Sequence, residues 1–131
     1  MFHVRDLKIV GIATPDPDEA VTTFRKNFGF PIVRATENGA ARTRSTFLAV
    51  GSAEIEMTAP TEGGSPLSSF LAERGAGLHQ LVLEVDDLEA ALGELKEKGI
   101  EAVTKPGTDG RPVVVLSPTQ THGVRITLVG R

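Results

Sequence analysis

The chain has 131 residues, of which 40% are hydrophobic and 24% are charged, with a net charge of −3 and no cysteine. This profile is typical of one soluble globular domain. The acidic balance, without any run of Lys or Arg, excludes nucleic acid as the main partner, because phosphate binding requires a basic patch. The absence of cysteine excludes disulfides, catalytic thiols and thiolate metal sites.

The chain also lacks the sequence features of a membrane or secreted protein. No stretch approaches the roughly 20 consecutive apolar residues of a membrane span. Residues 1–6 contain no apolar run of the length found in signal peptides. We therefore expect a cytoplasmic protein that has no membrane partner.

The first half of the chain predicts a strand, a helix and then further strands. Residues 8–14 form a short apolar run that is rich in β-branched side chains, as strands are. Asp16 then provides a helix cap, with Pro17 at the first helical position and Glu19 three residues after the cap. The helix is expected to end by Gly29. Further on, Asn38 and Gly39 together predict a hairpin turn.

The second half predicts the same order of elements after a short connecting helix. This linker helix covers about residues 65–75, starting at Ser65. A strand over residues 80–85 follows, and either Asp86 or Asp87 caps a second amphipathic helix that ends at Gly99. Strands are then expected over residues 113–116 and 125–128. The linker is too short and too regularly patterned to separate two domains, so we expect one domain over residues 1–131.

An internal repeat relates the two halves at an offset of 71 positions (80 minus 9). Ile9 corresponds to Gln80, and the capping residue Asp16 corresponds to Asp87. The same offset relates Glu56 to Thr127, near the end of each half. The sequence therefore predicts two copies of one supersecondary unit.

Alternation along the predicted strands separates two sets of side chains, because neighbouring residues of a strand face opposite sides of a sheet. One set is apolar and suits a core covered by the helices. The other set is mixed and mostly polar. Its members are Ile9, Glu54, Glu56, Gln80, Glu84, Arg125 and Thr127. Alternation alone leaves two interpretations open: the polar set lines the inside of a curved sheet, or it is the solvated face of an antiparallel sheet.

Three segments resemble the vicinal oxygen chelate superfamily of glyoxalases, bleomycin-resistance proteins and extradiol dioxygenases. They are Gly51 to Pro60 (GSAEIEMTAP), Ser65 to Asp87 (SPLSSFLAERGAGLHQLVLEVDD) and Thr121 to Val129 (THGVRITLV). Within that superfamily the chain is most similar to the methylmalonyl-CoA epimerases. The resemblance implies an α+β fold with two tandem βαβββ modules, at about residues 6–60 and 77–131. The modules would form a curved mixed sheet, or cup, with helices on its outer face.

The superfamily holds a divalent metal in the cup with residues from the first and last strands of each module. The resemblance places Ile9, Glu56, Gln80 and Thr127 at those four positions. An isoleucine has no lone pair to give, and a threonine hydroxyl and an amide are weak ligands for a transition metal. We therefore predict no metal ligands and no cofactor.

Glu56 is then the candidate catalytic residue, because a partly desolvated carboxylate can serve as a general base. Arg125 is a candidate for binding an anionic ligand group or for pairing with Glu54, which is its counterpart in the repeat. Arg44 is a further cation within reach of a ligand. The predicted ligand-binding residues are Ile9, Gln80, Glu84, Arg125, Thr127 and Arg44.

Two functions follow from these residues, and they leave open whether the chain is an enzyme. The main prediction is a cup protein that binds a small organic molecule without a tightly held metal, for sequestration or for base chemistry at Glu56. The alternative is a metal-dependent isomerase or lyase, similar to methylmalonyl-CoA epimerase, with an atypical ligand set. A regulatory or dimer-stabilising module is a third possibility. The resemblance also implies a homodimer.

Overall fold

The computed structural model describes residues 1–107 and 109–131, and the chain divides into two compact units. Unit one contains residues 1–9 and 80–131, and unit two contains residues 10–79. The boundary differs from that between the two sequence repeats, because the first part of the first strand belongs with the second repeat.

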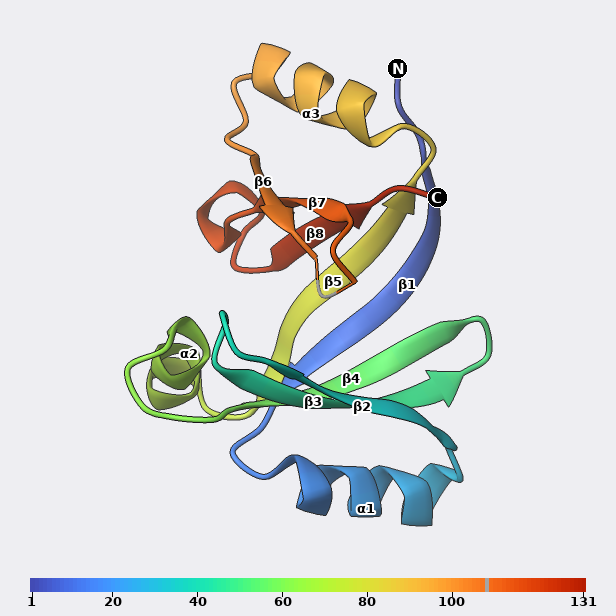
Figure 1. Ribbon diagram of the computed structural model, residues 1–131, viewed down its shortest axis with the longest axis vertical. Coiled ribbons are helices and arrows are strands. Elements are labelled where there is room, and N and C mark those ends of the chain that lie inside the picture. The colour runs from blue at the N-terminus through green and yellow to red at the C-terminus, as the bar shows by residue number, and fades with distance from the viewer. Residues whose placement is uncertain (108) are drawn as a thin grey trace. The chain divides into compact units, whose positions relative to one another are not determined.

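Unit two contains the elements of the first repeat and the linker helix (Figure 1). Its strands lie in the order β2-β3-β4-β1, and β3 is antiparallel to both β2 and β4. The elements are the second part of β1 (Val4–Ala13), α1 (Pro17–Phe28), β2 (Ile32–Asn38), β3 (Thr43–Val50), β4 (Ala53–Pro60) and α2 (Pro66–Arg74).

Unit one repeats this order of elements, as the sequence predicts. Its strands lie in the order β1-β5-β8-β7-β6, in which β5 and β8 are parallel and β7 is antiparallel to both β6 and β8. The elements are β5 (Gly77–Val85), α3 (Leu88–Glu97), β6 (Val103–Pro106), β7 (Pro112–Leu116), the short 3-10 helix η1 (Pro118–Gln120) and β8 (Arg125–Val129). The α+β class, the mixed sheet and the two βαβββ repeats are therefore confirmed.

The predicted helix caps are present in both units. The Asp16 side chain accepts a hydrogen bond of 3.1 Å from the backbone N–H of Glu19, and Gly29 ends α1 with a φ of 74°, in the left-handed region. In unit one it is Asp87, and not Asp86, that caps α3, by accepting from the backbone N–H of Ala90. No described helix has both the length and the apolar character needed to cross a membrane.

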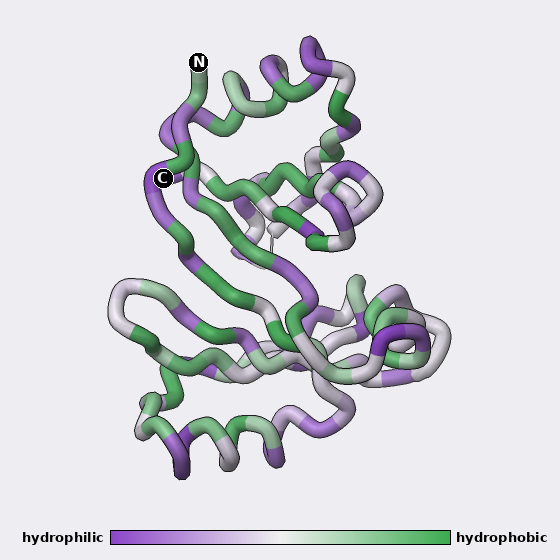
Figure 2. The backbone as a smooth tube through the Cα atoms, turned by 180° about the vertical axis from the view of Figure 1, so that it is seen from behind, coloured by the Kyte–Doolittle hydropathy of each residue, from purple (hydrophilic) through white to green (hydrophobic). Residues whose placement is uncertain are grey.

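Helices α1 and α3 each cover the apolar face of the strands in their own unit. In unit two, Val21 of α1 packs with Leu48 and Met57 of the strands, and in unit one Leu95 of α3 packs with Leu128. Both helices carry hydrophilic and hydrophobic residues in turn along their length (Figure 2), as expected when one side of a helix covers a sheet. The apolar set of the strands therefore forms the two cores.

The opposite face of the strands is not a solvated surface. Among its residues, Ser45, Phe47 and Thr58 in unit two are between 4% and 7% exposed, and Thr127 in unit one is 8% exposed. This burial rules out the interpretation of the polar set as the open face of an antiparallel sheet. The polar side chains on this face must therefore find hydrogen-bond partners within the protein.

The N-terminal segment of unit one is held by Asp86, and β1 begins four residues earlier than residue 8, where the sequence predicts it. Backbone groups of His3 and Asp86 bond to each other, with Asp86 N–H donating to the His3 carbonyl at 3.1 Å. The His3 N–H donates to the Asp86 carboxylate at 2.8 Å, and Arg5 lies 3.3 Å from that carboxylate. These donors, the backbone N–H first, lower the pKa of Asp86 below its ordinary value.

Leu48→Ala is expected to lower the free energy of unfolding by about 2–5 kcal/mol, because Leu48 is fully buried in the core of unit two and its loss leaves a cavity. Urea denaturation followed by circular dichroism measures the change. Thr23→Ala on the exposed side of α1 is the control, with an expected change within about 0.5 kcal/mol. Equal effects of the two substitutions would contradict the assignment of the core.

Asp86→Asn is expected to destabilise the protein at pH 7 and to have less effect at acidic pH. Because the pKa of Asp86 is lowered in the folded state, its ionised form adds stability above the unfolded-state pKa of about 4. That stability is lost as the pH falls through the lower folded-state value. Urea denaturation of both proteins between pH 7 and pH 3 tests this, with Asp6→Asn as the control. A difference that stays constant over this range would refute the role of Asp86.

Candidate functional site

In unit two, a row of side chains crosses the three strands on the face turned away from α1. In the strand register, Arg34 of β2 lies opposite Phe47 of β3, and Phe47 lies opposite Glu56 of β4. Met57, the next residue after Glu56, packs in the core beneath α1. Since successive side chains alternate between faces, the row lies on the side of the strands opposite that core.

Glu56 is fixed on this face by a buried hydroxyl. The Ser45 hydroxyl donates to Oε2 of Glu56 at 2.6 Å, a length typical of a hydrogen bond to an ionised carboxylate. The Oγ atoms of Ser45 and Thr58 lie 2.9 Å apart, and these two residues are direct partners in the register. The candidate base predicted from the sequence therefore belongs to a hydrogen-bonded group of three side chains.

Glu54, two residues before Glu56 on β4, forms an ion pair with Arg34. The two terminal guanidinium nitrogens donate to the two carboxylate oxygens, both at 2.8 Å. The guanidinium carbon also lies 3.9 Å from the centre of the Phe47 ring, in the geometry of a cation–π contact. The hydrogen bonds to Glu54 are the main reason why the pKa of Arg34 is raised, and the charge of Glu56 adds to the effect.

The sequence analysis missed this role of Arg34. The repeat pointed to Arg125 as the partner of Glu54, whereas Arg34 lies 20 positions from Glu54 in the sequence. Only the register of β2 on β3 and of β3 on β4 reveals the pairing. In the sequence, only the alternation of the polar residues Arg34 and Thr36 along β2 indicated that Arg34 shares a face with the polar set, and two residues are a weak signal.

In unit one, Gln80 and Thr127 are joined by a hydrogen bond. Thr127 Oγ1 donates to Gln80 Oε1 at 3.1 Å, between the neighbouring parallel strands β5 and β8. Gln80 and Arg125 are direct partners in the same ladder. Ile9 of β1 also belongs to this unit and is half-buried. The structure therefore groups three of the predicted ligand-binding side chains on two adjacent strands.

Glu84, another predicted ligand-binding residue, is surrounded by cations of its own unit. Lys8 lies 3.7 Å and Arg131 lies 3.5 Å from its carboxylate oxygens. The Glu84 side chain is 19% exposed, while both cations are more exposed. This arrangement places Glu84 at the centre of an ion-pair cluster, and its role in ligand binding stays a prediction.

Arg44 lies on the other face of the strands from Glu56. Its register partner on β4 is Ala59, which alternates with Thr58, and its guanidinium is 3.7 Å from the Asp18 carboxylate of α1. A ligand bound by Arg44 would therefore lie on the α1 side of the strands, and the ligand-binding role of Arg44 stays a prediction. The sequence analysis did not fix the parity of β3 relative to β4, so it could not place Arg44.

The donor set does not fit a tightly held divalent metal. Among the described residues, no group of three or more His, Cys, Asp or Glu side chains is arranged to hold a metal ion. Ile9 offers no donor, and Gln80 and Thr127 offer neutral oxygens that already bond to each other. Neutral amide and hydroxyl oxygens are poor ligands for a transition metal.

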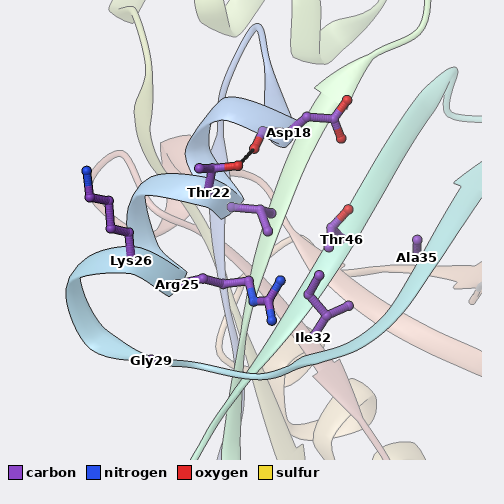
Figure 3. Close-up of a pocket in the computed structure, with 9 residues that line it drawn as sticks. Asp18, Thr22, Arg25, Lys26, Gly29, Ile32, Ala35 and Thr46 are labelled. Carbon is purple, nitrogen blue, oxygen red and sulfur yellow. Dashed lines mark hydrogen bonds between the residues drawn. The ribbon is translucent and has the colours of Figure 1, made fainter.

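A groove of about 640 Å³ lies between α1 and the strands β2 and β3 of unit two. Figure 3 shows the Arg25 side chain extending from α1 toward Ile32, with Thr46 on the far wall. Arg25 and Lys26 occupy the last turn of α1, where basic residues stabilise the negative end of the helix dipole. The position of Arg25 and Lys26 at the end of α1 is therefore explained by the stability of the helix. The groove lies on the opposite face of the strands from Glu56.

The structure therefore defines two groups of candidate residues, each within its own unit. Glu56 with Ser45 and Thr58 belongs to unit two, and Gln80 with Arg125 and Thr127 belongs to unit one. That both groups contact one ligand stays a prediction from the sequence.

Comparison with known proteins shows the family of this chain. The family model of the Glyoxalase/Bleomycin resistance protein/Dioxygenase superfamily matches residues 10–115. The human mitochondrial methylmalonyl-CoA epimerase is 31% identical over 132 residues, covering 98% of this chain and 75% of that protein.

Solved structures of epimerases share the fold. The crystal structure of methylmalonyl-CoA epimerase from Mycobacterium tuberculosis matches with a TM-score of 0.89 and 32% identity, covering 97% of this chain and 88% of that one. A variant of the Streptomyces coelicolor epimerase, in complex with 2-nitronate-propionyl-CoA, matches with a TM-score of 0.89 and 26% identity over 98% of this chain and 95% of that one. The chain therefore belongs to the glyoxalase/bleomycin resistance protein/dioxygenase superfamily.

Proposed function

We propose that this protein is an epimerase of acyl-CoA thioesters, which inverts the carbon next to the thioester carbonyl. The observation that carries the proposal is the similarity to methylmalonyl-CoA epimerases over nearly the whole chain, at 31% identity in sequence and a TM-score of 0.89 in structure. The bound 2-nitronate-propionyl-CoA of the Streptomyces coelicolor relative supports a CoA thioester as the substrate class.

The main prediction from the sequence was wrong: it was a cup protein that binds a small organic molecule without a tightly held metal, for sequestration or for base chemistry at Glu56. The comparisons favour the alternative, an isomerase similar to methylmalonyl-CoA epimerase. Several relatives that match over nearly the whole chain are named as epimerases, and an epimerase variant among the matches is solved with a CoA ligand. The sequence analysis gave too much weight to the substituted metal positions. The loss of ligands bears on how the reaction is performed, and it is a poor guide to which reaction is performed.

Glu56 is the residue that we assign as the base. Epimerisation removes the proton next to the thioester carbonyl and returns one on the opposite face, and a positioned carboxylate contributes about 10²- to 10⁴-fold to such a proton transfer. The contact with Ser45 holds one carboxylate oxygen in place. Glu54, by contrast, has both oxygens bonded to Arg34 and is unsuited to take up a proton.

In unit one, we assign Gln80, Arg125 and Thr127 as ligand-binding residues. The amide N–H groups of Gln80 and the guanidinium of Arg125 can donate hydrogen bonds to the carbonyl and carboxylate oxygens of a 2-carboxyacyl thioester. The hydroxyl proton of Thr127 goes to Oε1 of Gln80, so Thr127 orients that amide. Ile9 adds apolar surface. Each of these assignments rests on the position of the residue in its strand and on its chemistry.

We also propose that the protein holds no divalent metal tightly, because the donor chemistry of Ile9, Gln80 and Thr127 does not fit one. Elemental analysis of protein purified without chelator tests this point. A near-stoichiometric content of a divalent metal would overturn it without affecting the proposed reaction.

We also propose a cellular location and an oligomeric state. A cytoplasmic homodimer, in which residues 1–131 act as one functional domain, agrees with the resemblance to the superfamily. Light scattering of the purified protein tests the dimer. A monomeric mass at micromolar concentration would refute it.

The wild-type protein is expected to convert one diastereomer of methylmalonyl-CoA into a mixture of both. In D2O the reaction should also replace the proton next to the thioester carbonyl with deuterium. Proton NMR measures the exchange, and chiral chromatography measures the inversion, each against the rate without protein. If neither rate exceeds this background, with or without added cobalt or manganese, the proposed function is refuted.

Glu56→Gln is expected to lower kcat by about 10²- to 10⁴-fold, because the amide cannot accept the proton. The unfolding midpoint of this variant shows whether the fold is intact. Glu37→Gln is the matched control, because Glu37 is exposed on β2 and shares the face of its partner Arg44. Equal activity of the two variants would remove Glu56 from the mechanism.

A further inference from the structure

Three neighbouring side chains of unit two, Ser45, Glu56 and Thr58, form a hydrogen-bonded group on a face with little access to solvent. Ser45 is 6% exposed and Thr58 is 4% exposed. Oγ of Ser45 lies 2.6 Å from Oε2 of Glu56 and 2.9 Å from Oγ1 of Thr58. The serine hydroxyl therefore has two oxygen neighbours at hydrogen-bond distance.

The single proton of the serine hydroxyl can serve only one of these neighbours. A carboxylate is the stronger acceptor, and the shorter distance lies on that side. Ser45 therefore donates to Glu56, and its own oxygen is left to accept from the Thr58 hydroxyl. The other acceptor near the Thr58 hydroxyl, the Arg44 carbonyl, is farther away, at 3.4 Å.

The result is a series of two hydrogen bonds, in which Thr58 donates to Ser45 and Ser45 donates to Glu56. Hydrogen bonds arranged head to tail polarise one another, so the bond to the carboxylate is strengthened by the one behind it. Since Ser45 and Thr58 lie on adjacent antiparallel strands, their separation is set by the ladder itself. These hydrogen bonds therefore fix the position of Oε2 of Glu56 relative to the backbone of the two strands.

We propose that Ser45, supported by Thr58, is a positioning residue that holds Oε2 of Glu56 in a fixed place relative to the strands. This proposal rests on the proposed function, because it presumes that Glu56 is the base. Orientation of a reacting group is a large part of catalysis, and a displacement of about 1 Å can cost about 100-fold in rate. Ser45 itself takes up no proton from the substrate.

A purely structural role is the competing explanation. Buried hydroxyls on adjacent strands commonly satisfy each other, and such a pair contributes roughly 0.2–1 kcal/mol to a sheet. In that case Ser45→Ala would change the free energy of unfolding and leave kcat unaffected. The two explanations therefore differ in what they predict for catalysis and for the Glu56 carboxylate.

The kinetic test compares Ser45→Ala with Ser45→Thr, which keeps the hydroxyl. Ser45→Ala is expected to lower kcat by about 10- to 100-fold with KM within about threefold of the wild-type value, and Ser45→Thr to recover most of the loss. Thr58→Val should give a smaller decrease in kcat. Thr46→Val is the matched control, because Thr46 is the next residue on β3 and faces the α1 groove.

A second measurement needs no activity. In protein labelled with ¹³C-glutamate, the antisymmetric carboxylate stretch of Glu56 is assigned by its absence in Glu56→Gln. This band is expected to shift in Ser45→Ala and, by less, in Thr58→Val, while Thr46→Val leaves it in place. If Ser45→Ala does not fold, Thr58→Val keeps both measurements possible.

The outcomes separate this proposal from the proposed function. An unshifted band in Ser45→Ala, or an unchanged kcat in an active enzyme, overturns the positioning role. A shifted band in a wild-type protein that epimerises no thioester confirms the hydrogen-bond chain, but it overturns the proposed function and with it the positioning of a base. A shifted band together with a lowered kcat supports both.

Discussion

The alternation of side chains along β3 and β4, together with the antiparallel register between these strands, governs both the core and the candidate site of unit two. Leu48 and Met57 face α1 and form its core, while Ser45, Glu56 and Thr58 face the other way and bond to one another. A slip of one residue would move every side chain of a strand to the opposite face. The burial of Leu48 and Met57 therefore also fixes the face on which Glu56 lies.

The carboxylates of the strands differ in the groups that contact them. Glu54 and Glu84 are paired with cations. Oε2 of Glu56 accepts a hydrogen bond from the Ser45 hydroxyl, and the charge of Glu56 contributes to the raised pKa of Arg34.

The fold indicates an epimerase, whereas the residues at the expected metal positions do not fit the metal that the superfamily holds. The fold matches epimerases at a TM-score of 0.89, whereas Ile9, Gln80 and Thr127 supply no charged ligand. A fold can keep its architecture while individual side chains change, because the core positions and the site positions alternate along the same strands. In this chain the apolar set forms the two cores, while Ile9, Gln80 and Thr127 of the other set carry no charge.

The sequence by itself determined the elements that depend on local signals. The cap at Asp16, the glycine that ends α1 and the linker helix follow from residues close together in the chain. The repeat follows from an offset of 71 positions, whereas the choice between Asp86 and Asp87 as the cap of α3 was left to the structure. Only the tertiary structure decided which polar side chains meet. Arg34 and Glu54, like Ser45 and Glu56, lie far apart in the sequence and are joined by strand register, and register depends on packing over the whole sheet, which no local pattern encodes.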